Sequence, residues 1–370
     1  MLDKKKLLIQ TDSNAMGGAE KYLFDIIPNL KQCFDNVTLI CLSDHKVDGL
    51  RQFASKEKVV VKPVGKKYWF SLKYLLQIAK LIFNSDVIFV NKINPAKSLV
   101  IIFISLIFKK KICCIEHLNI DIISRYWLKP PILKFLIKKL MNKVGCVIVL
   151  SDNAKVFFEQ TYGYQKSLTK IIYNGVEAIP DLAVTDNITN NCRVILVGRL
   201  SAQKNQTSFI ENIRPLIEKM IEHEINLIVE LWGDGELRNK IKKQITDSKL
   251  QNNVILKGFS SKKDEIYSHK DILVMPSLSE GFPFVMLEAA SYGIPIIATD
   301  VGGISDFVEH GINGYLVDKK KFNQINDYIF DLAINPQVRK KMGLQARMKL
   351  ERSFTKKQMV DSTIEVLNKL

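Results

Sequence analysis

The sequence predicts an α/β protein of two domains, each built on a doubly wound parallel sheet. Short apolar segments of strand length alternate with amphipathic segments of helix length along nearly the whole chain. The 370 residues are too many for one ordinary hydrophobic core and suit two domains of about 150–200 residues each. A hydrophobic content of 47% and a charged content of 25% are typical of a globular protein.

The first half of the sequence shows this alternation of strand and helix patterns. Strands are expected at residues 5–11, 37–41, 59–61, 87–90, 111–115 and 146–150, and a clear amphipathic helix at 72–83. The first strand leads into a turn at Gly17 and Gly18 that opens a helix, and exposed amides in such a turn can approach a phosphate or a sugar. These glycines do not spell G-x-G-x-x-G, which argues against a dinucleotide-binding oxidoreductase.

The second half repeats this alternation after a polar linker at 178–191. Strands are expected at 193–197, 227–231, 254–258, 272–275 and 294–299, and a final helix at 356–370. Arg199 and Lys204 follow the first of these strands. A guanidinium fork and an ammonium on one loop suit the oxygens of a diphosphate.

The segment from 271 to 290 combines several features of an anion site. Its strand ends at Pro276, and Pro283 stands where a helix would begin, a position that tolerates the missing N–H. The amides at the start of this helix would attract a phosphate. Glu280 on the turn and Glu288 in the helix lie roughly 12 Å apart if the connection is helical. Two such acids could hold both ends of a molecule with a diphosphate in its middle, and a nucleotide-sugar has this layout.

A histidine stands at the end of another expected strand. His117 follows the strand at 111–115, and the carboxyl ends of parallel strands border the crevice in which such sheets bind ligands. His117 is therefore a candidate ligand-binding residue, although a single histidine is more often structural.

Positive charge is concentrated in the first half of the chain. The net charge is +16; residues 1–180 contain 28 Lys and Arg against 14 Asp and Glu, whereas residues 181–370 contain 26 and 24. A basic half can meet nucleic acid, an anionic membrane or an anionic acceptor. A helical pattern after Trp127 alternates apolar residues with lysines and could lie on an anionic membrane, or be an ordinary packing helix. Its candidate membrane contacts are Lys129, Lys134, Lys138, Lys139 and Lys143.

The remaining composition favours a cytoplasmic location. No N-terminal signal peptide is visible, and the longest apolar stretch, 99–108, falls short of the roughly 20 residues of a spanning helix. The six cysteines form no C-x-x-C pair, so neither structural disulfides nor a zinc site is expected.

Several motifs together resemble one enzyme family. The pattern E-G-F-P-x-x-x-x-E-A at 280–289, followed by G-I-P-I-I-A-T-D-V-G-G at 293–303, resembles the donor site of the retaining glycosyltransferases of family GT4. The string G-R-L-x-x-x-K-N at 198–205, the turn at Gly17 and Gly18, and His117 are also similar to that family. The resemblance implies a GT-B fold, with two Rossmann-like domains facing a central cleft. Residues 1–175 would bind the acceptor, with helix 356–370 packing back on them, and residues 176–355 would bind the donor.

The resemblance also implies a reaction and a role for each motif residue. A sugar would pass from a nucleoside diphosphate sugar, UDP-sugar being favoured, to a saccharide with retention of configuration. Arg199 and Lys204 would stabilise the leaving diphosphate, Glu288 would bind the ribose, and Glu280 and His117 the transferred sugar. These positions join a larger expected donor-binding set: Gly17, Gly18, Arg199, Lys204, Gly233, Gly258, Phe259, Glu280, Gly281, Phe282, Phe284, Val285 and Glu288. No cofactor and no metal are expected, because the cations would replace a divalent ion.

The expected acceptor is a saccharide, linked to polyprenyl diphosphate, in O-antigen or capsule synthesis. The protein would then sit on the cytoplasmic face of the inner membrane without binding nucleic acid. Two alternatives stay open: a glycosyltransferase with a soluble acceptor, and a non-catalytic basic protein that binds nucleic acid. A phosphorylase of the same fold is disfavoured, because no lysine motif for pyridoxal is visible.

Overall fold

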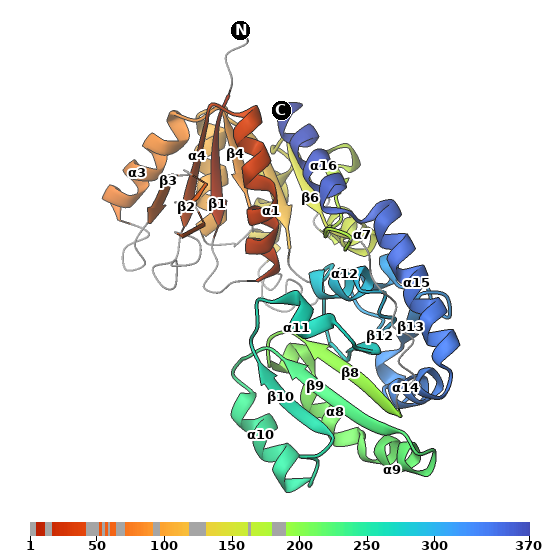
Figure 1. Cartoon of the computed structure of the whole chain (residues 1–370). Helices are drawn as coiled ribbons and strands as arrows, with labels where there is room; N and C mark the ends of the chain where they lie inside the picture. Colours follow the sequence, from red (N-terminus) through yellow and green to blue (C-terminus); the bar gives the residue numbers. More distant parts are fainter. Residues whose placement is uncertain are drawn as a thin grey trace. The chain divides into compact units, whose positions relative to one another are not determined.

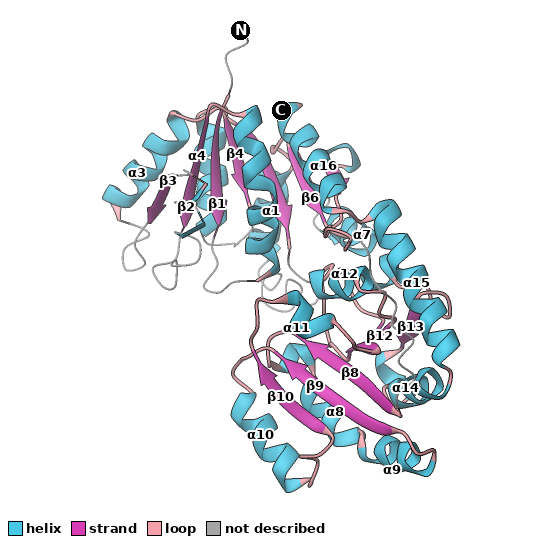
Figure 2. Ribbon diagram, in the orientation of Figure 1, coloured by secondary structure: helices cyan, strands magenta, loops and turns pink. Residues whose placement is uncertain are grey.

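The computed structural model divides the chain into two compact units. Unit 1 comprises residues 1–174 together with the last helix, 356–370, and unit 2 comprises residues 175–355. The structure describes residues 5–11, 17–41, 52–53, 56–57, 60–63, 71–91, 97–117, 131–161, 164–179 and 190–370. Figures 1 and 2 show that strands and helices alternate along the chain in both units.

Unit 1 contains a sheet of seven parallel strands in the order β3-β2-β1-β4-β5-β6-β7. The strands are β1 (Lys6–Thr11), β2 (Asn36–Cys41), β3 (Val60–Pro63), β4 (Val87–Val90), β5 (Lys111–Glu116), β6 (Cys146–Val149) and β7 (Thr169–Ile171). Its helices are α1 (Gly18–Cys33), α3 (Leu72–Phe83), α4 (Lys97–Ile107), α6 (Pro131–Met141), α7 (Asp152–Thr161) and α16 (Lys356–Asn368). The strand order reverses between β1 and β4, which is the point where sheets of this kind bind ligands.

Helix α16 closes unit 1 by packing on α1 (Figure 1). Tyr22 and Thr363 share a hydrogen bond between their hydroxyl groups, and both residues are buried. Lys356 Nζ lies 3.1 Å from Asp25 Oδ1 on the same pair of helices. The C-terminal segment is therefore an integral layer of the first unit.

Unit 2 repeats the topology with six parallel strands in the order β10-β9-β8-β11-β12-β13. The strands are β8 (Asn191–Val197), β9 (Asn226–Trp232), β10 (Val254–Gly258), β11 (Ile272–Met275), β12 (Ile296–Thr299) and β13 (Gly314–Val317). Its helices are α8 (Gln206–Asn212), α9 (Arg214–Glu222), α10 (Arg238–Asp247), α11 (Lys263–Tyr267), α12 (Phe284–Ser291), α13 (Ile304–Phe307), α14 (Gln324–Ile334) and α15 (Pro336–Ser353). Its order reverses between β8 and β11.

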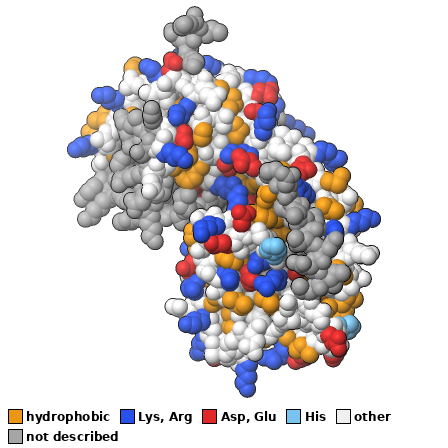
Figure 3. Space-filling view, in the orientation of Figure 1, with side chains coloured by type: hydrophobic (Ala, Val, Ile, Leu, Met, Phe, Trp, Pro, Cys, Tyr) orange, Lys and Arg blue, Asp and Glu red, His pale blue; other side chains and the backbone are white. Residues whose placement is uncertain are grey.

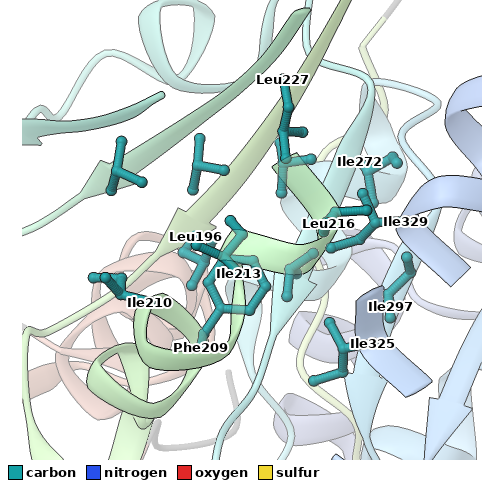
Figure 4. Packing of buried hydrophobic residues seen from close by; sticks show 14 of the residues in the cluster. Leu196, Phe209, Ile210, Ile213, Leu216, Leu227, Ile272, Ile297, Ile325 and Ile329 are labelled. Atoms are coloured by element: carbon teal, nitrogen blue, oxygen red, sulfur yellow. The ribbon is translucent and has the colours of Figure 1, made fainter. Parts of the chain in front are cut away.

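The core of unit 2 lies between the sheet and helices α8, α9 and α14 (Figure 4). Leu196, Leu227, Ile272 and Ile297 from four strands meet Phe209, Ile210, Leu216, Ile325 and Ile329 from these helices. Because neighbouring strand residues point to opposite faces, the other face of the same strands is left for α12 and the site that it carries.

The predicted α/β class with two doubly wound parallel sheets is confirmed. Strand β13 was not predicted. It has only four residues, and the two in the middle are only partly buried, so its apolar pattern is weak. The helix predicted to begin at Pro283 begins one residue later, with Pro283 as the N-cap.

Candidate active site

The loops after β8 and β11 meet at the topological switch point of unit 2. These strands are neighbours, with Ile272 beside Val194 and Leu273 beside Ile195. Their carboxyl ends therefore open at the same edge of the sheet. The loop after β8 carries Arg199 and Lys204, and the loop after β11 carries Glu280. The fold thus brings together two motifs that are 76 residues apart in the sequence.

Glu280 is held by two donors that both reach the same carboxylate oxygen. Lys204 Nζ and Ser277 Oγ each lie 2.6 Å from Glu280 Oε1. The side chain of Glu280 is 6% exposed and that of Lys204 20% exposed, so this ion pair is largely shielded from water. Among the described residues, none donates a hydrogen bond to Glu280 Oε2. That oxygen is left as a hydrogen-bond acceptor.

The main chain around Glu280 is fixed by close packing. Gly303 N donates to Gly281 O at 2.7 Å. Gly302 adopts a left-handed conformation with φ of 62°, and a Cβ on it would lie 1.9 Å from Glu280 O. Only glycine fits there. The glycine pair after β12 therefore supports the turn that presents Glu280.

Gln203 joins the two loops on the other side of this turn. Its Nε2 donates to Ser279 O at 2.8 Å, and its carbonyl accepts from Leu278 N at 2.8 Å. Lys204 follows Gln203 directly, so this clamp positions the ammonium of Lys204 as well as the backbone before Glu280.

A small hollow, with room for about one water molecule, lies beside this ion pair. It is lined by the polar residues Lys204, Gln206 and Ser277 and by the apolar residues Leu196, Val197, Val274, Met275 and Pro276. Gln206 is 2% exposed, and its Oε1 has no hydrogen-bond partner, although its Nε2 donates to Arg199 O. Buried polar atoms are rarely left unpaired. Gln206 Oε1 can therefore accept a hydrogen bond from a water or a ligand atom in this hollow.

Glu288 lies in α12 and is oriented by two residues of α11. Tyr267 Oη donates to Glu288 Oε2 at 2.9 Å, and Lys263 Nζ lies 3.3 Å from Glu288 Oε1. Burial, followed by the neighbouring Glu288 carboxylate, raises the pKa of Tyr267 well above its usual range. Tyr267 therefore remains a neutral donor that keeps Glu288 in one orientation.

Arg199 stands at the exposed rim of the same loop. Its Nε lies 3.0 Å from Glu236 Oε2, and both side chains are more than half exposed. A surface ion pair of this kind contributes little to stability. Arg199 can consequently exchange Glu236 for a phosphate at small cost.

The glycine turns after β8, β9 and β10 pack on one another. A Cβ on Gly233, whose φ is 132°, would lie 2.0 Å from Gly198 O. Gly233 N also donates to Gly258 O at 2.7 Å. Phe259, the residue after Gly258, is 76% exposed. Three of the predicted donor-binding residues, Gly233, Gly258 and Phe259, therefore lie on one connected set of turns.

The aromatic residues beside Pro283 do not offer their side chains to a ligand. Phe282 and Phe284 are both buried, and the ring of Phe282 stacks on Phe354 at 5.5 Å. Any donor contact from Phe282 or Phe284 would come from the main chain at the start of α12, whereas Val285 is only partly buried.

In unit 1, His117 lies at the carboxyl end of β5 as predicted. Its Nε2 is 3.1 Å from Asn91 Oδ1, at the end of neighbouring β4. The imidazole also meets the edge of Tyr22 with ring centroids 5.3 Å apart. Gly17 is the N-cap of α1, and its N–H donates to Glu20 Oε2 at 3.0 Å. Gly18 is the first residue of the helix.

The predicted membrane lysines are only partly described. Lys138, Lys139 and Lys143 are exposed at the end of α6 and just after it. Lys129 and the side chain of Lys134 lie outside the described residues. None of the described helices has the length and apolarity needed to span a bilayer. In the described ranges, no three His, Cys, Asp or Glu side chains are grouped to hold a metal.

Two family models match the chain one after the other. Residues 16–178 match "Glycosyltransferase Family 4", and residues 184–349 match "Glycosyl transferases group 1". The chain belongs to this glycosyltransferase family. Glu280, Glu288, Arg199 and Lys204 all lie within the group 1 match, and Gly17, Gly18 and His117 lie within the family 4 match.

Several characterised proteins are similar over part of this family member. The chain is 34% identical over 170 residues to the UDP-Gal:alpha-D-GlcNAc-diphosphoundecaprenol alpha-1,3-galactosyltransferase of Escherichia coli, covering 45% of this chain and 42% of that one. It is 27% identical over 191 residues to the poly(glycerol-phosphate) alpha-glucosyltransferase of Bacillus subtilis, covering 51% and 28%. These matches span less than half of each relative's length.

Similar solved structures establish the fold. Anabaena HepE in complex with UDP and glucose has a TM-score of 0.81 at 22% identity, covering 99% of this chain and 100% of that one. Staphylococcus aureus TarM in a complex with UDP has a TM-score of 0.77 at 15% identity, covering 98% and 100%. The fold is therefore GT-B, as the resemblance implied.

Sequence motifs did not reveal every residue that the structure places at the site. Ser277 was not among the predicted site residues, yet its hydroxyl donates to Glu280 Oε1. Its position three residues before the glutamate could have suggested this contact. Tyr267 and Lys263 were not predicted at all, because their approach to Glu288 depends on the packing of α11 on α12.

Proposed function

We propose that this family member is a retaining glycosyltransferase that transfers a hexosyl group from a UDP-sugar to a saccharide acceptor. One observation carries the proposal: Lys204 and Glu280 lie 2.6 Å apart at the switch point of unit 2. A cation for the diphosphate and a carboxylate for the sugar are thereby held next to each other, as a nucleotide-sugar requires. Two similar structures are complexes with UDP and glucose and with UDP-glucose, which supports this class of donor.

The diphosphate would be stabilised by Lys204, by Arg199 and by the first amides of α12. Negative charge grows on the leaving diphosphate, and pre-positioned cations and dipoles are usually the largest contribution to catalysis. Lys204 also offsets the charge of Glu280, which would otherwise repel the donor. No metal is proposed, since these cations supply the positive charge that an ion would bring.

The two glutamates would hold the ends of the donor. Glu288, oriented by Tyr267, would accept hydrogen bonds from the ribose hydroxyls. Glu280 would accept one from the transferred sugar through Oε2, because Oε1 is already engaged. His117 of unit 1, whose Nε2 faces Asn91 Oδ1, would contact a hydroxyl of the same sugar.

The acceptor proposed is a saccharide linked to polyprenyl diphosphate, in cell-surface polysaccharide synthesis such as that of O-antigen or capsule. The name of the Escherichia coli relative, which acts on a diphosphoundecaprenol-linked sugar, supports this class. The protein would work at the cytoplasmic face of the inner membrane. A soluble acceptor is the second candidate, favoured by the 30% identity over 163 residues to a 2-deoxystreptamine N-acetyl-D-glucosaminyltransferase.

A thermal-shift screen with UDP, GDP, ADP and their sugar conjugates tests the donor. The proposal predicts that UDP and one UDP-sugar raise Tm, and that EDTA leaves the shift unchanged. No shift with any nucleotide, together with salt-sensitive binding of DNA or RNA, would favour the non-catalytic basic protein instead. A UDP shift that EDTA abolishes would contradict the metal-free donor site.

A further inference from the structure

Three helices of unit 1 lie side by side on one face of its sheet. Helix α4 contacts both α3 and α6. Each contributes inward side chains to one core cluster; they include Ile78 and Ile82 from α3, Ile101 and Ile102 from α4, and Ile137 and Met141 from α6. The opposite sides of the three helices therefore form one outer surface, called here the α3–α4–α6 face.

Helix α3 has a second apolar side on this face. Leu72, Leu76 and Phe83 are 73%, 61% and 62% exposed. Their spacing places all three within about 40° of one another around the helix axis. That stripe lies opposite the inward residues. An amphipathic helix of a globular protein normally has polar residues there.

Helices α4 and α6 continue the pattern. Phe103 and Ile107, one turn apart on α4, are 57% and 60% exposed, and Phe135 on α6 is 62% exposed. Isolated exposed apolar residues are normal on protein surfaces. Here, among the described residues of unit 1, six of the seven large hydrophobics that are exposed lie on this one face. Such clustering marks an interaction surface.

Lysines surround the exposed apolar side chains. Residues 72–143 contain 13 Lys and Arg against three acids, Asp86, Glu116 and Asp121. Glu116 is buried, and Asp86 accepts a hydrogen bond from Lys6 N at 2.7 Å. Exposed lysines of the described helices and their ends are Lys73, Lys80, Lys109, Lys138, Lys139 and Lys143. In Figure 3, hydrophobic and Lys or Arg side chains lie next to one another where α3 stands in Figure 1.

We propose that the α3–α4–α6 face docks on an anionic lipid bilayer. Leu72, Leu76, Phe103 and Ile107 insert among the acyl chains, and the surrounding lysines bind the headgroups. Bulky apolar side chains ringed by lysines are the composition by which a helix lies in a membrane interface. This inference rests on the proposed membrane-borne acceptor and deepens it, since it extends the contact from the lysines of α6 to an inserted apolar surface on α3 and α4.

The test compares vesicle binding of the full-length chain with that of a variant without the apolar side chains. The variant is Leu72→Ser, Leu76→Ser, Phe103→Ser and Ile107→Ser, all at exposed positions. Vesicles contain phosphatidylglycerol and phosphatidylcholine, at about 0.1 M and about 0.5 M NaCl, because salt screens the lysines but not the apolar contact. We expect the variant to bind at least about tenfold more weakly, with the larger loss at high salt.

A matched control removes equally exposed apolar groups from unit 2. Ile221→Ser, Val338→Ser and Met348→Ser replace side chains that are 65%, 44% and 59% exposed, and vesicle binding should not change. Equal binding by the wild type and the α3–α4 variant would overturn the proposal, as would absence of binding by the wild type. Binding that falls equally in the control would also overturn it.

Two further readouts keep the result interpretable. Hydrolysis of the UDP-sugar without acceptor should be the same in wild type and variant; loss of hydrolysis in both would refute the proposed function and leave the docking result standing. If the fourfold variant does not fold, Phe103→Trp replaces it. Brominated acyl chains should quench its emission, taken as the difference from the wild type with its three tryptophans, but not that of Ile221→Trp, and equal quenching would contradict insertion.

Discussion

Lys204 Nζ lies 2.6 Å from Glu280 Oε1, and Ser277 Oγ reaches the same oxygen at 2.6 Å. The cation assigned to the diphosphate and the carboxylate assigned to the sugar thus form one unit at the switch point of unit 2. The pair depends on parallel strands β8 and β11 being neighbours. Because both contacts are made to Oε1, they fix the orientation of the carboxylate and therefore the direction of Glu280 Oε2.

Replacing Glu280 should affect turnover more than nucleotide binding. Glu280→Gln keeps a carbonyl oxygen for Lys204 and Ser277 but removes the charge that binds the sugar hydroxyl. We expect kcat to fall about 100-fold or more, a loss typical of one transition-state contact. UDP affinity, measured by calorimetry, should stay within about threefold. Unchanged turnover would remove Glu280 from the mechanism.

Ser277 should act only through Glu280. Ser277→Ala removes one hydrogen bond to a charged group, worth about 1.5–3 kcal/mol, and should lower kcat while leaving KM for the donor little changed. In the Glu280→Gln background the same substitution should cost much less. Equal costs in both backgrounds, measured in a double-mutant cycle, would show that Ser277 acts independently.

Tyr267 should affect donor affinity, because it orients the glutamate assigned to the ribose. Tyr267→Phe removes the 2.9 Å hydrogen bond to Glu288 and should raise KM for the donor about fivefold, in line with about 1 kcal/mol, with little effect on kcat. Tyr315→Phe is the control, since it removes a similar hydrogen bond, to Asp331, at β13. A fall in kcat alone would contradict the assignment.

Glu230 should make unit 2 sensitive to acid. Burial would raise its pKa, but hydrogen bonds from Lys270 and Trp232 and the charges of nearby lysines together lower it below 4.5. A depressed pKa contributes stability that is present above pH 4.5 and lost as pH falls through the folded-state value. Glu230→Gln leaves Lys270 unpaired in a buried site, and should cost about 3 kcal/mol at pH 7.

Denaturant unfolding from pH 7 to pH 3 tests this prediction. The wild type should lose stability as the pH falls below 4.5, and the gap between wild type and Glu230→Gln should narrow there. Arg193 Nη1, 3.4 Å from the same carboxylate, is partly exposed, so Arg193→Gln should have the smaller effect. A gap that stays constant with pH would contradict the role of the ionised carboxylate.

The sequence was sufficient for the fold because its signals are local. Apolar runs such as 272–275 are bounded by proline and glycine, and they alternate with helical patterns. Parallel order then follows from the general rules of such sheets. Strand β13 was not predicted, because a short and half-buried strand has few apolar residues in its sequence pattern.

The contacts within the site were less predictable, because they join distant segments. The types of residue at 199, 204, 280 and 288 were legible as motifs. Their pairing was not: Lys204 was expected to serve only the diphosphate, yet it binds Glu280. The burial of Phe282 and Phe284 was also invisible, since a helix start alone does not show which side chains pack inward.

The α3–α4–α6 face was only partly anticipated for the same reason. Lysines after Trp127 suggested membrane contact, but the exposed stripe of Leu72, Leu76 and Phe83 looked like part of an ordinary amphipathic helix. Only the packed structure shows that α3 has apolar residues on two sides.

Calorimetric titration of UDP into the wild type, Lys204→Ala and Lys243→Ala tests the central claim most directly. Lys243 is an exposed lysine of α10, away from the switch point, and serves as the control. We predict that Lys204→Ala weakens UDP binding about 10- to 100-fold, the range expected for one charged contact, while Lys243→Ala binds like the wild type. UDP binding that is unchanged in Lys204→Ala would show that the diphosphate does not lie at the Lys204–Glu280 pair.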